Sequence, residues 1–238
     1  MTHIHLFGGE KGGVGKSFVC RTAIAFHLHR QLDFVAFDAD RSNADVLRIY
    51  GDKTGCQRAI LSEADKYDNA ANEIFNAALD GRRVLANLPA QAMPSLRQWI
   101  DDNELFEVAA EGNVQFVSWF VSDCGLDSLN LFSKLLDLWG ESMQHVFVAN
   151  YGMTERWDRL KQDRALMQRM RGRGVKLIKF PKFVGRSDRD RIDELSLTFE
   201  QAASHDDFGA ISRQRVKSFL RKAFDEFDRT GVFDDDWS

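Results

Sequence analysis

The sequence predicts an α/β protein with a doubly wound, mainly parallel sheet flanked by helices. Three observations lead to this fold class. Short apolar runs typical of buried strands alternate with longer segments whose apolar residues repeat at helical spacing. A glycine-rich loop joins the first of these strands to the first of these helices. No internal repeat, low-complexity run or linker divides the chain, so residues 1–238 are expected to form a single domain.

The composition is that of an ordinary globular protein. Hydrophobic residues make up 44% and charged residues 29% of the 238 positions, and the net charge of −4 argues against coating nucleic acid by bulk charge. The three cysteines are widely separated, which suits packing roles in a reducing cytoplasm. There is no basic-then-apolar N-terminal signal and no apolar run of about 18 residues, so neither secretion nor membrane spanning is expected.

The first strand, loop and helix form a phosphate-binding arrangement. Residues 4–7 are an apolar run, residues 18–32 have helical spacing, and the loop Lys-Gly-Gly-Val-Gly-Lys-Ser at 11–17 lies between them. The glycines let successive backbone N–H groups converge, and the helix N-terminus adds its positive dipole. Lys16 would reach the β- and γ-phosphates, and the Ser17 hydroxyl would ligate Mg²⁺. A chance glycine-rich turn is the alternative, which the fit of both flanks argues against.

The loop departs from the usual G-x-x-x-x-G-K-[ST] pattern at its first glycine, which is replaced by Glu10. A second lysine, Lys11, opens the loop instead. The loop therefore resembles the K-G-G-x-G-K-[ST] signature of the ParA/MinD family of deviant Walker A P-loop ATPases. The resemblance implies binding of ATP and Mg²⁺, and an ATP-dependent homodimer in which Lys11 reaches the partner's nucleotide. It assigns nucleotide binding to Gly12, Gly13, Val14, Gly15, Lys16, Ser17 and Phe18.

The second predicted strand, residues 34–37, ends at Asp38-Ala39-Asp40. Carboxylates at the carboxyl end of a strand beside a phosphate loop lie where open α/β sheets bind ligands. The ParA/MinD family has a D-x-D at this place. The resemblance gives Asp40, in switch I, the role of positioning the attacking water, and gives Asp38 a role in the Mg²⁺ shell or in structure. The alternative is that Asp40 is the N-cap of a helix at residues 43–50.

The third predicted strand, within residues 82–90, leads into switch II and contains an asparagine at an unexpected position. In relatives this strand ends in D-x-P, and the Walker B aspartate holds Mg²⁺ through water; this chain has Asn87 there. An amide can hydrogen-bond a metal-bound water but brings no negative charge, so Mg²⁺ binding should weaken. We therefore expect slow hydrolysis, or a metal site in which Asp38 takes over part of the work.

The two last strands carry residues that the resemblance places at the base of the nucleotide. The strand at 145–150 ends in Asn150, which reads the adenine edge in the family; without the resemblance, a terminal asparagine is a turn former. The strand at 175–180 is followed by Pro181, in a loop that wraps the purine in relatives.

Other elements are predicted from spacing alone. They are a turn at 51–55, a surface loop at 62–69, helices at 70–79, 96–108 and 127–138, a strand at 113–121 and a charged loop or helix start at 186–191.

Two basic segments offer possible contacts with anionic partners. Residues 154–173 are rich in arginine and predict a helical face for DNA, although Asp158 and Asp163 dilute it and solvated arginines are the alternative. Residues 211–228 predict a basic amphipathic helix, which MinD-like relatives lay on membranes. The acidic residues 234–236 would be repelled by anionic lipid, so packing on the sheet is expected and membrane attachment is not.

The resemblance predicts a ParA-like ATPase whose ATP-sandwich dimer binds nonspecific DNA or a stimulating partner protein to position plasmid or cellular cargo. The small plasmid partition, stability and conjugative-transfer members are the most similar. The location is then the bacterial cytoplasm, with nucleoid association where DNA is bound. Lys11, Lys16 and Asp40 are the expected catalytic residues, and Ser17, Asp38 and Asn87 the metal site. The alternatives are an ATP-binding scaffold with negligible hydrolysis, a membrane-cycling regulator and a P-loop metabolic enzyme.

Overall fold

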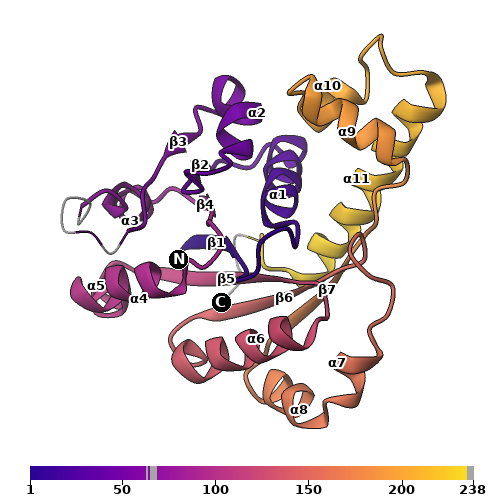
Figure 1. Cartoon of the computed structure of the whole chain (residues 1–238). Helices are drawn as coiled ribbons and strands as arrows, with labels where there is room; N and C mark the ends of the chain where they lie inside the picture. The colour runs from indigo at the N-terminus through magenta and orange to yellow at the C-terminus, as the bar shows by residue number, and fades with distance from the viewer. Residues whose placement is uncertain (63, 65–68, 235–238) are drawn as a thin grey trace.

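The computed structural model describes residues 1–62, 64 and 69–234 (Figure 1). Within them, a parallel sheet of seven strands has the order β3-β2-β4-β1-β5-β6-β7. This order places β1 in the middle and extends the sheet to both sides of it, as the sequence predicts for a doubly wound fold. The strands are β1 Thr2–Gly8, β2 Val35–Asp38, β3 Gln57–Arg58, β4 Val84–Asn87, β5 Val114–Ser122, β6 Gln144–Asn150 and β7 Lys176–Phe180.

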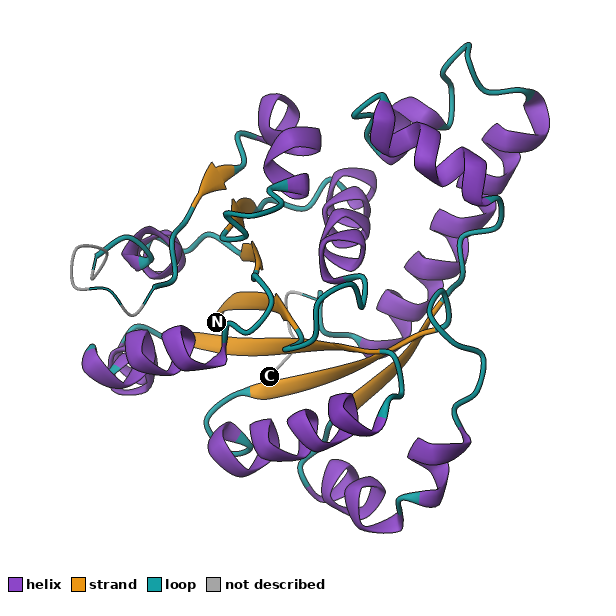
Figure 2. Cartoon of the chain, in the orientation of Figure 1, coloured by secondary structure: helices purple, strands orange, loops and turns teal. Residues whose placement is uncertain are grey.

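Helices cover both faces of the sheet (Figure 2). Because both faces are covered, the central strands are mostly buried, and β2 and β4 are buried along their whole length. One face carries α1 Lys16–Arg30, α2 Asp45–Thr54, α9 Arg186–Glu194, α10 Phe199–Ala202 and α11 Ala210–Thr230. The other carries α3 Asn72–Leu79, α4 Met93–Asp102, α5 Leu105–Glu111, α6 Leu126–Trp139, α7 Asp158–Gln162 and α8 Arg164–Gly172.

The strand register brings polar side chains together at the carboxyl edge of the sheet. Asn87, the last residue of β4, is the register partner of Asp38 on β2 and of Phe7 on β1. Asn150 ends β6 and Phe180 ends β7 at the same edge. The predicted site residues on these strands are therefore neighbours in the fold, although the sequence separates them widely.

Several predicted boundaries need correction. The predicted turn at 51–55 is wrong, because α2 continues to Thr54 and ends at Gly55 with φ 65°. The helix predicted over 96–108 is two helices, α4 and α5, separated by Glu104 in a left-handed conformation with φ 49°. The charged segment 186–191 needs no correction: of the two predicted forms, a loop or a helix start, it is the start of α9. Residues 63 and 65–68 of the predicted surface loop, and 235–236 of the acidic end, lie outside the described residues.

The basic segment at 154–173 also forms two helices, α7 and α8, where one was predicted. Asp163 accepts a hydrogen bond from the backbone N–H of Leu166 at 2.9 Å and is the N-cap of α8. A capping aspartate favours the start of a new helix, because it satisfies a backbone donor that has no partner within the helix. In the sequence, Asp163 stands out only as a negative charge that dilutes the basic segment.

Helix α11 packs on the sheet, as the sequence predicts. The Phe224 ring contacts Phe26 of α1 at 5.4 Å, and the Phe227 ring contacts Trp119 of β5 at 5.5 Å between ring centroids. Figure 1 shows α11 running beside α1 toward β7. The apolar face of this helix is therefore used within the fold. None of the helices in the described part combines the length and the apolar character needed to cross a bilayer.

Candidate functional site

The loop between β1 and α1 has the backbone geometry of a phosphate cradle. Gly13 and Gly15 have φ values of 75° and 97°, which side chains other than glycine rarely adopt. At Gly15 a Cβ atom would also lie 2.5 Å from the Asn150 amide nitrogen. The loop leads directly into α1, whose first residue is Lys16, so the positive end of a long helix faces the loop.

Asn150 holds this loop in place. Its Nδ2 donates to the Val14 carbonyl oxygen at 2.8 Å, and its Oδ1 accepts from the Gly152 backbone N–H at 2.9 Å. The predicted contact of Asn150 with the adenine edge stays a prediction. Its other amide hydrogen and second oxygen lone pair would have to make that contact, because an amide offers two donors and two acceptor sites.

Lys16 is the buried cation of the site. Its side chain is almost covered, and its Nζ donates to the Lys11 carbonyl oxygen at 3.1 Å. Burial lowers the pKa of Lys16, and the nearby carboxylates of Asp40 and Glu10 partly oppose that shift. No ion pair with Lys16 occurs among the described residues, so its charge is available to an anion in the loop.

Asp38, Asn87 and Ser17 form a polar cluster beside Lys16. Asn87 Nδ2 donates to Asp38 Oδ1 at 2.9 Å and lies 3.4 Å from Ser17 Oγ. The other Asp38 oxygen accepts from the backbone N–H of Leu47 in the first turn of α2 at 3.0 Å. Burial raises the pKa of Asp38, and these hydrogen bonds partly oppose the shift.

The cluster fits a hydrated metal ion. Asn87 Oδ1 is fully buried, and no described residue donates to it. Turning the amide over would place this oxygen against the Asp38 carboxylate, so the orientation is fixed by repulsion. A metal-bound water is a donor suited to such an oxygen, and Mg²⁺ keeps several waters when it binds proteins. The described residues contain no cluster of three or more His, Cys, Asp or Glu that could hold a metal alone. Phosphate oxygens would have to complete the shell.

Asp40 shapes the loop that follows β2. One of its oxygens accepts from Ser42 N at 3.0 Å, Ser42 Oγ at 2.7 Å and Asn43 N at 3.1 Å. The alternative that Asp40 is a helix N-cap is wrong, because Ala44 occupies that position of α2. Asp38, from the end of β2, supplies the side-chain acceptor to the first turn instead.

Lys11 is exposed and pairs with an acidic residue that no motif in the sequence indicates. Its Nζ forms an ion pair with Asp123, directly after β5, at 2.6 Å. The hydrogen bond to Asp123 raises the pKa of Lys11. The two residues are 112 positions apart, and no local pattern in the sequence signals such a pairing.

Two further predicted sites are Pro181, expected at the base, and the basic segment at 154–173, expected to contact DNA. Pro181 follows β7 at the same edge of the sheet and is half-buried. In the basic segment, Arg169 bonds Ser133 and Asp137 of α6, Arg173 pairs with Glu141, and Arg159 donates to the Cys124 carbonyl. Much of the positive charge predicted for DNA is therefore used to attach α7 and α8 to the rest of the fold.

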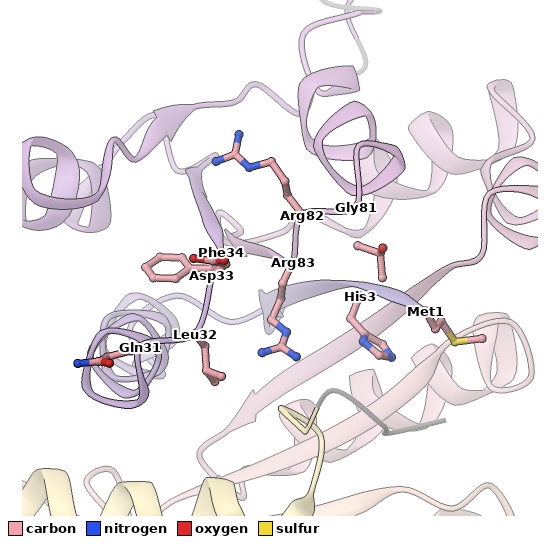
Figure 3. A pocket seen from close by; sticks show the side chains of 10 residues that line it. Met1, His3, Gln31, Leu32, Asp33, Phe34, Gly81, Arg82 and Arg83 are labelled. Atoms are coloured by element: carbon pink, nitrogen blue, oxygen red, sulfur yellow. The ribbon is translucent and has the colours of Figure 1, made fainter.

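A cavity of about 590 Å³ lies at the opposite, amino edge of the sheet (Figure 3). Arg82, Arg83 and His3 line it, together with the turn that follows α1. Ligands of open α/β sheets bind at the carboxyl ends of the strands, so this cavity is not where the nucleotide is expected.

Comparisons with known proteins agree with the fold. No family model matches the sequence. The chain is 27% identical over 187 residues to Protein MobD of Acidithiobacillus ferrooxidans, covering 79% of this chain and 81% of that protein. It superposes on the MinC:MinD cell division protein complex of Aquifex aeolicus with a TM-score of 0.51 and 12% identity, over 95% of this chain and 97% of that chain. The fold is that of the P-loop NTPases. The signal recognition particle receptor FtsY of Elizabethkingia anophelis gives a TM-score of 0.46 at 14% identity, over 92% of this chain and 65% of that one.

Proposed function

We propose that this chain binds ATP and Mg²⁺ at residues 11–17 and hydrolyses ATP slowly, as a dimer that forms when ATP is bound. The observation that carries the proposal is the loop itself. Its glycines adopt left-handed φ values, a helix N-terminus faces it, and the buried Lys16 has no ion pair among the described residues. Such a combination gathers positive charge and backbone N–H donors at one loop, which is what a triphosphate requires.

The roles of the remaining residues follow from their positions. Ser17, Asn87 and Asp38 would hold the hydrated Mg²⁺, which when bound neutralises charge on the β- and γ-phosphates. Asp40 lies in the loop after β2 and would orient the attacking water through its second oxygen, since its first is used within the loop. Asn150 and Pro181 are the proposed contacts to the base.

Dimerisation would require Lys11 to change partner. In the single chain its ammonium is bound to Asp123 at 2.6 Å, so a nucleotide from a second copy must compete with that carboxylate. Exposed ion pairs are weak because solvent screens them, and a triphosphate carries more negative charge than one carboxylate. The competition therefore favours the nucleotide when two copies meet face to face.

The cellular role that we propose is positioning or transfer of plasmid or other cargo through DNA or a partner protein. The likeness to Protein MobD supports a mobilisation role of this kind. DNA contact would come from Arg156, Arg164 and Arg171, which have no ion pair among the described residues. A bacterial cytoplasmic location accompanies this role.

The test is light scattering of the purified chain with and without ATP and Mg²⁺, together with nucleotide binding. The wild type should dimerise with ATP. Lys16→Ala should lose nucleotide binding, whereas Lys11→Ala should bind ATP and stay monomeric. Lys134→Ala, which removes an exposed lysine from α6, is the matched control and should behave as wild type. Failure of the wild type to bind ATP would refute the proposal.

A second candidate function is an ATP-binding scaffold with negligible turnover. The observation that favours it is Asn87, which brings no charge to the proposed metal site and donates an amide hydrogen bond to Asp38. The two functions differ in turnover. A scaffold dimerises with ATP but releases no phosphate, even when DNA or a partner is added, whereas the ATPase is accelerated by one of them.

A further inference from the structure

A groove with an apolar floor and a basic rim lies beside β7, away from the phosphate loop residues. It is formed by the loop that follows β7 and by the first half of α11, and has a volume of about 460 Å³. The residues that define this groove are Lys182, Val184, Ile211, Arg215, Phe219 and Lys222.

Two apolar side chains at the groove are unusually exposed. Ile211 is 72% and Val184 is 57% exposed, although both are aliphatic. Phe219, in contrast, is almost completely buried and lines the same groove from within. Covering apolar surface is favourable at about 25 cal/mol per Å², so an occupant with its own apolar side chain would be stabilised here.

All the charges that line the groove are positive. Every ionisable side chain of α11 from Ala210 to Phe224 is an arginine or a lysine, although the chain as a whole has a net charge of −4. Arg215 pairs with Asp188 at 2.9 Å and Lys182 with Glu155 at 3.2 Å, but Lys222 is exposed and has no ion pair among the described residues. The rim therefore has an excess of positive charge that attracts a negative occupant.

We infer that this groove is the docking site for an acidic segment of a partner protein that inserts an apolar side chain against Ile211, Val184 and Phe219. Charge complementarity selects the acidic segment, and the exposed aliphatic surface selects the apolar anchor.

A membrane or DNA fits the groove less well. The apolar face of α11, including Phe224 and Phe227, is packed against α1 and β5, so the helix cannot insert into a bilayer without leaving the fold. DNA would pair its phosphates with the lysines and arginines but would leave Ile211 and Val184 against a polar backbone. A polypeptide can offer acidic side chains to the basic rim and an apolar side chain to Ile211 and Val184.

The groove is also connected to the phosphate loop through aromatic contacts. The Phe219 ring lies 5.3 Å from the Phe18 ring and 5.2 Å from the Phe183 ring, between centroids. Phe18 follows Ser17 directly in the sequence. An occupant that moves Phe219 would therefore act on the first turn of α1. This link to nucleotide binding depends on the proposed function, whereas the docking itself does not.

The experiment measures fluorescence anisotropy of a fluorescein-labelled synthetic peptide in which glutamates flank leucines at helical i, i+3, i+4 and i+7 spacing. Two companion peptides replace the leucines by serine or the glutamates by lysine. We expect the acidic apolar peptide to bind the full chain, more tightly at 50 mM than at 200 mM salt. Ile211→Glu and Lys222→Glu should each weaken this binding by about tenfold or more.

Matched controls come from α6. Leu126 is 59% exposed, close to the value for Val184, and Lys134 is also exposed, so Leu126→Glu and Lys134→Glu should bind the peptide as wild type does. Thermal melting confirms that each variant is folded, and ATP binding should persist in all four. The inference is overturned if the serine peptide binds equally well, or if the groove variants and the controls behave alike. It is also overturned if a 20-bp DNA duplex or vesicles of anionic phosphatidylglycerol, and not the peptide, depend on Ile211 and Lys222.

Discussion

Replacing Asn87 by aspartate should destabilise the metal-free protein. In the structure Asn87 Nδ2 donates to Asp38 Oδ1 at 2.9 Å, and both side chains are buried. Asn87→Asp turns this donor into a second carboxylate. The two groups would then repel each other, unless a proton or a cation is shared between them.

The size of the effect can be derived from the contact. A hydrogen bond to a charged group contributes about 1.5–3 kcal/mol, and two like charges 4 Å apart repel by about 4 kcal/mol at an effective dielectric constant of 20. Uptake of a proton relieves part of the repulsion. We therefore expect a loss of about 2–4 kcal/mol near pH 8, which lowers the Tm of a protein of this size by about 5–15 °C.

The pH dependence has a definite sign. Burial already raises the pKa of Asp38, and the second carboxylate would raise it further. A carboxyl group whose pKa is raised by folding destabilises the protein above that pKa. The deficit of Asn87→Asp should therefore shrink as the pH falls through the folded-state pKa toward about 4, where the unfolded chain is also protonated.

The assay is thermal unfolding in EDTA and in Mg²⁺ with ATP, at pH 8 and pH 5.5. Mg²⁺ with ATP should recover most of the loss at pH 8, because at the proposed metal site the cation would offset the charge of the two carboxylates. The exchanged double variant Asp38→Asn with Asn87→Asp restores one amide and one carboxylate and should be more stable in EDTA than Asn87→Asp alone. Equal Tm values for wild type and Asn87→Asp in EDTA would refute the coupling of these two residues.

Three further predictions concern other contacts. Lys11→Ala should leave the Tm unchanged, because solvent screens the ion pair between Lys11 and Asp123. The variant should not dimerise with ATP when measured by light scattering. A dimer that persists would contradict the proposed role of Lys11. Asn150→Ala removes the hydrogen-bond donor to the Val14 carbonyl and should lower the free energy of unfolding, measured with denaturant, by about 1–3 kcal/mol. The same variant should bind ATP about tenfold more weakly. Unchanged ATP affinity would show that the loop keeps its conformation without Asn150. Burial lowers the pKa of His27 to about 3, so the unfolded chain takes up this proton first and His27 should contribute about 1.4 kcal/mol per pH unit to the loss of stability below about pH 6.5. His5 and His145, whose pKa values burial also lowers, add to the same loss. His27→Phe should therefore make the slope shallower by about 1.4 kcal/mol per pH unit, and an unchanged slope would exclude this contribution.

The sequence predicts the arrangement of the sheet well because the signals are local. An apolar strand, a glycine loop and an amphipathic helix each have a short-range pattern, and the alternation of the two element types leaves few topologies. The boundaries failed where apolar spacing continues across a break. Ile100 and Leu105 both face the core on either side of the interruption at Glu104, so periodicity alone joins α4 to α5. The strand β3 has two exposed residues and carries no apolar signal at all.

The order of the motifs predicts which residues lie together at the carboxyl edge of the sheet, but not which of them form hydrogen bonds or ion pairs with one another. The residue types at the ends of β2, β4 and β6 follow from motif order. That Asn87 donates to Asp38, or that Lys11 pairs with Asp123, depends on side chains 49 and 112 positions apart. Such contacts are set by strand register and by loop conformation, neither of which has a sequence pattern of its own.

These connections make Asp38 the point where three parts of the site meet. Its two oxygens bind Asn87 on β4, the backbone N–H of Asp40 and the backbone N–H of Leu47 in α2. A metal-bound water that donates to Asn87 Oδ1 would polarise the amide and strengthen its hydrogen bond to Asp38. The state of the metal site would then be transmitted to the loop that holds Asp40 without any charge at position 87. In an ordinary Walker B site the aspartate binds the metal water directly. At the site proposed here, the Asn87 amide would relay the contact of a metal-bound water to Asp38 on the neighbouring strand, so we expect the Asp38–Asn87 pair to act as one unit.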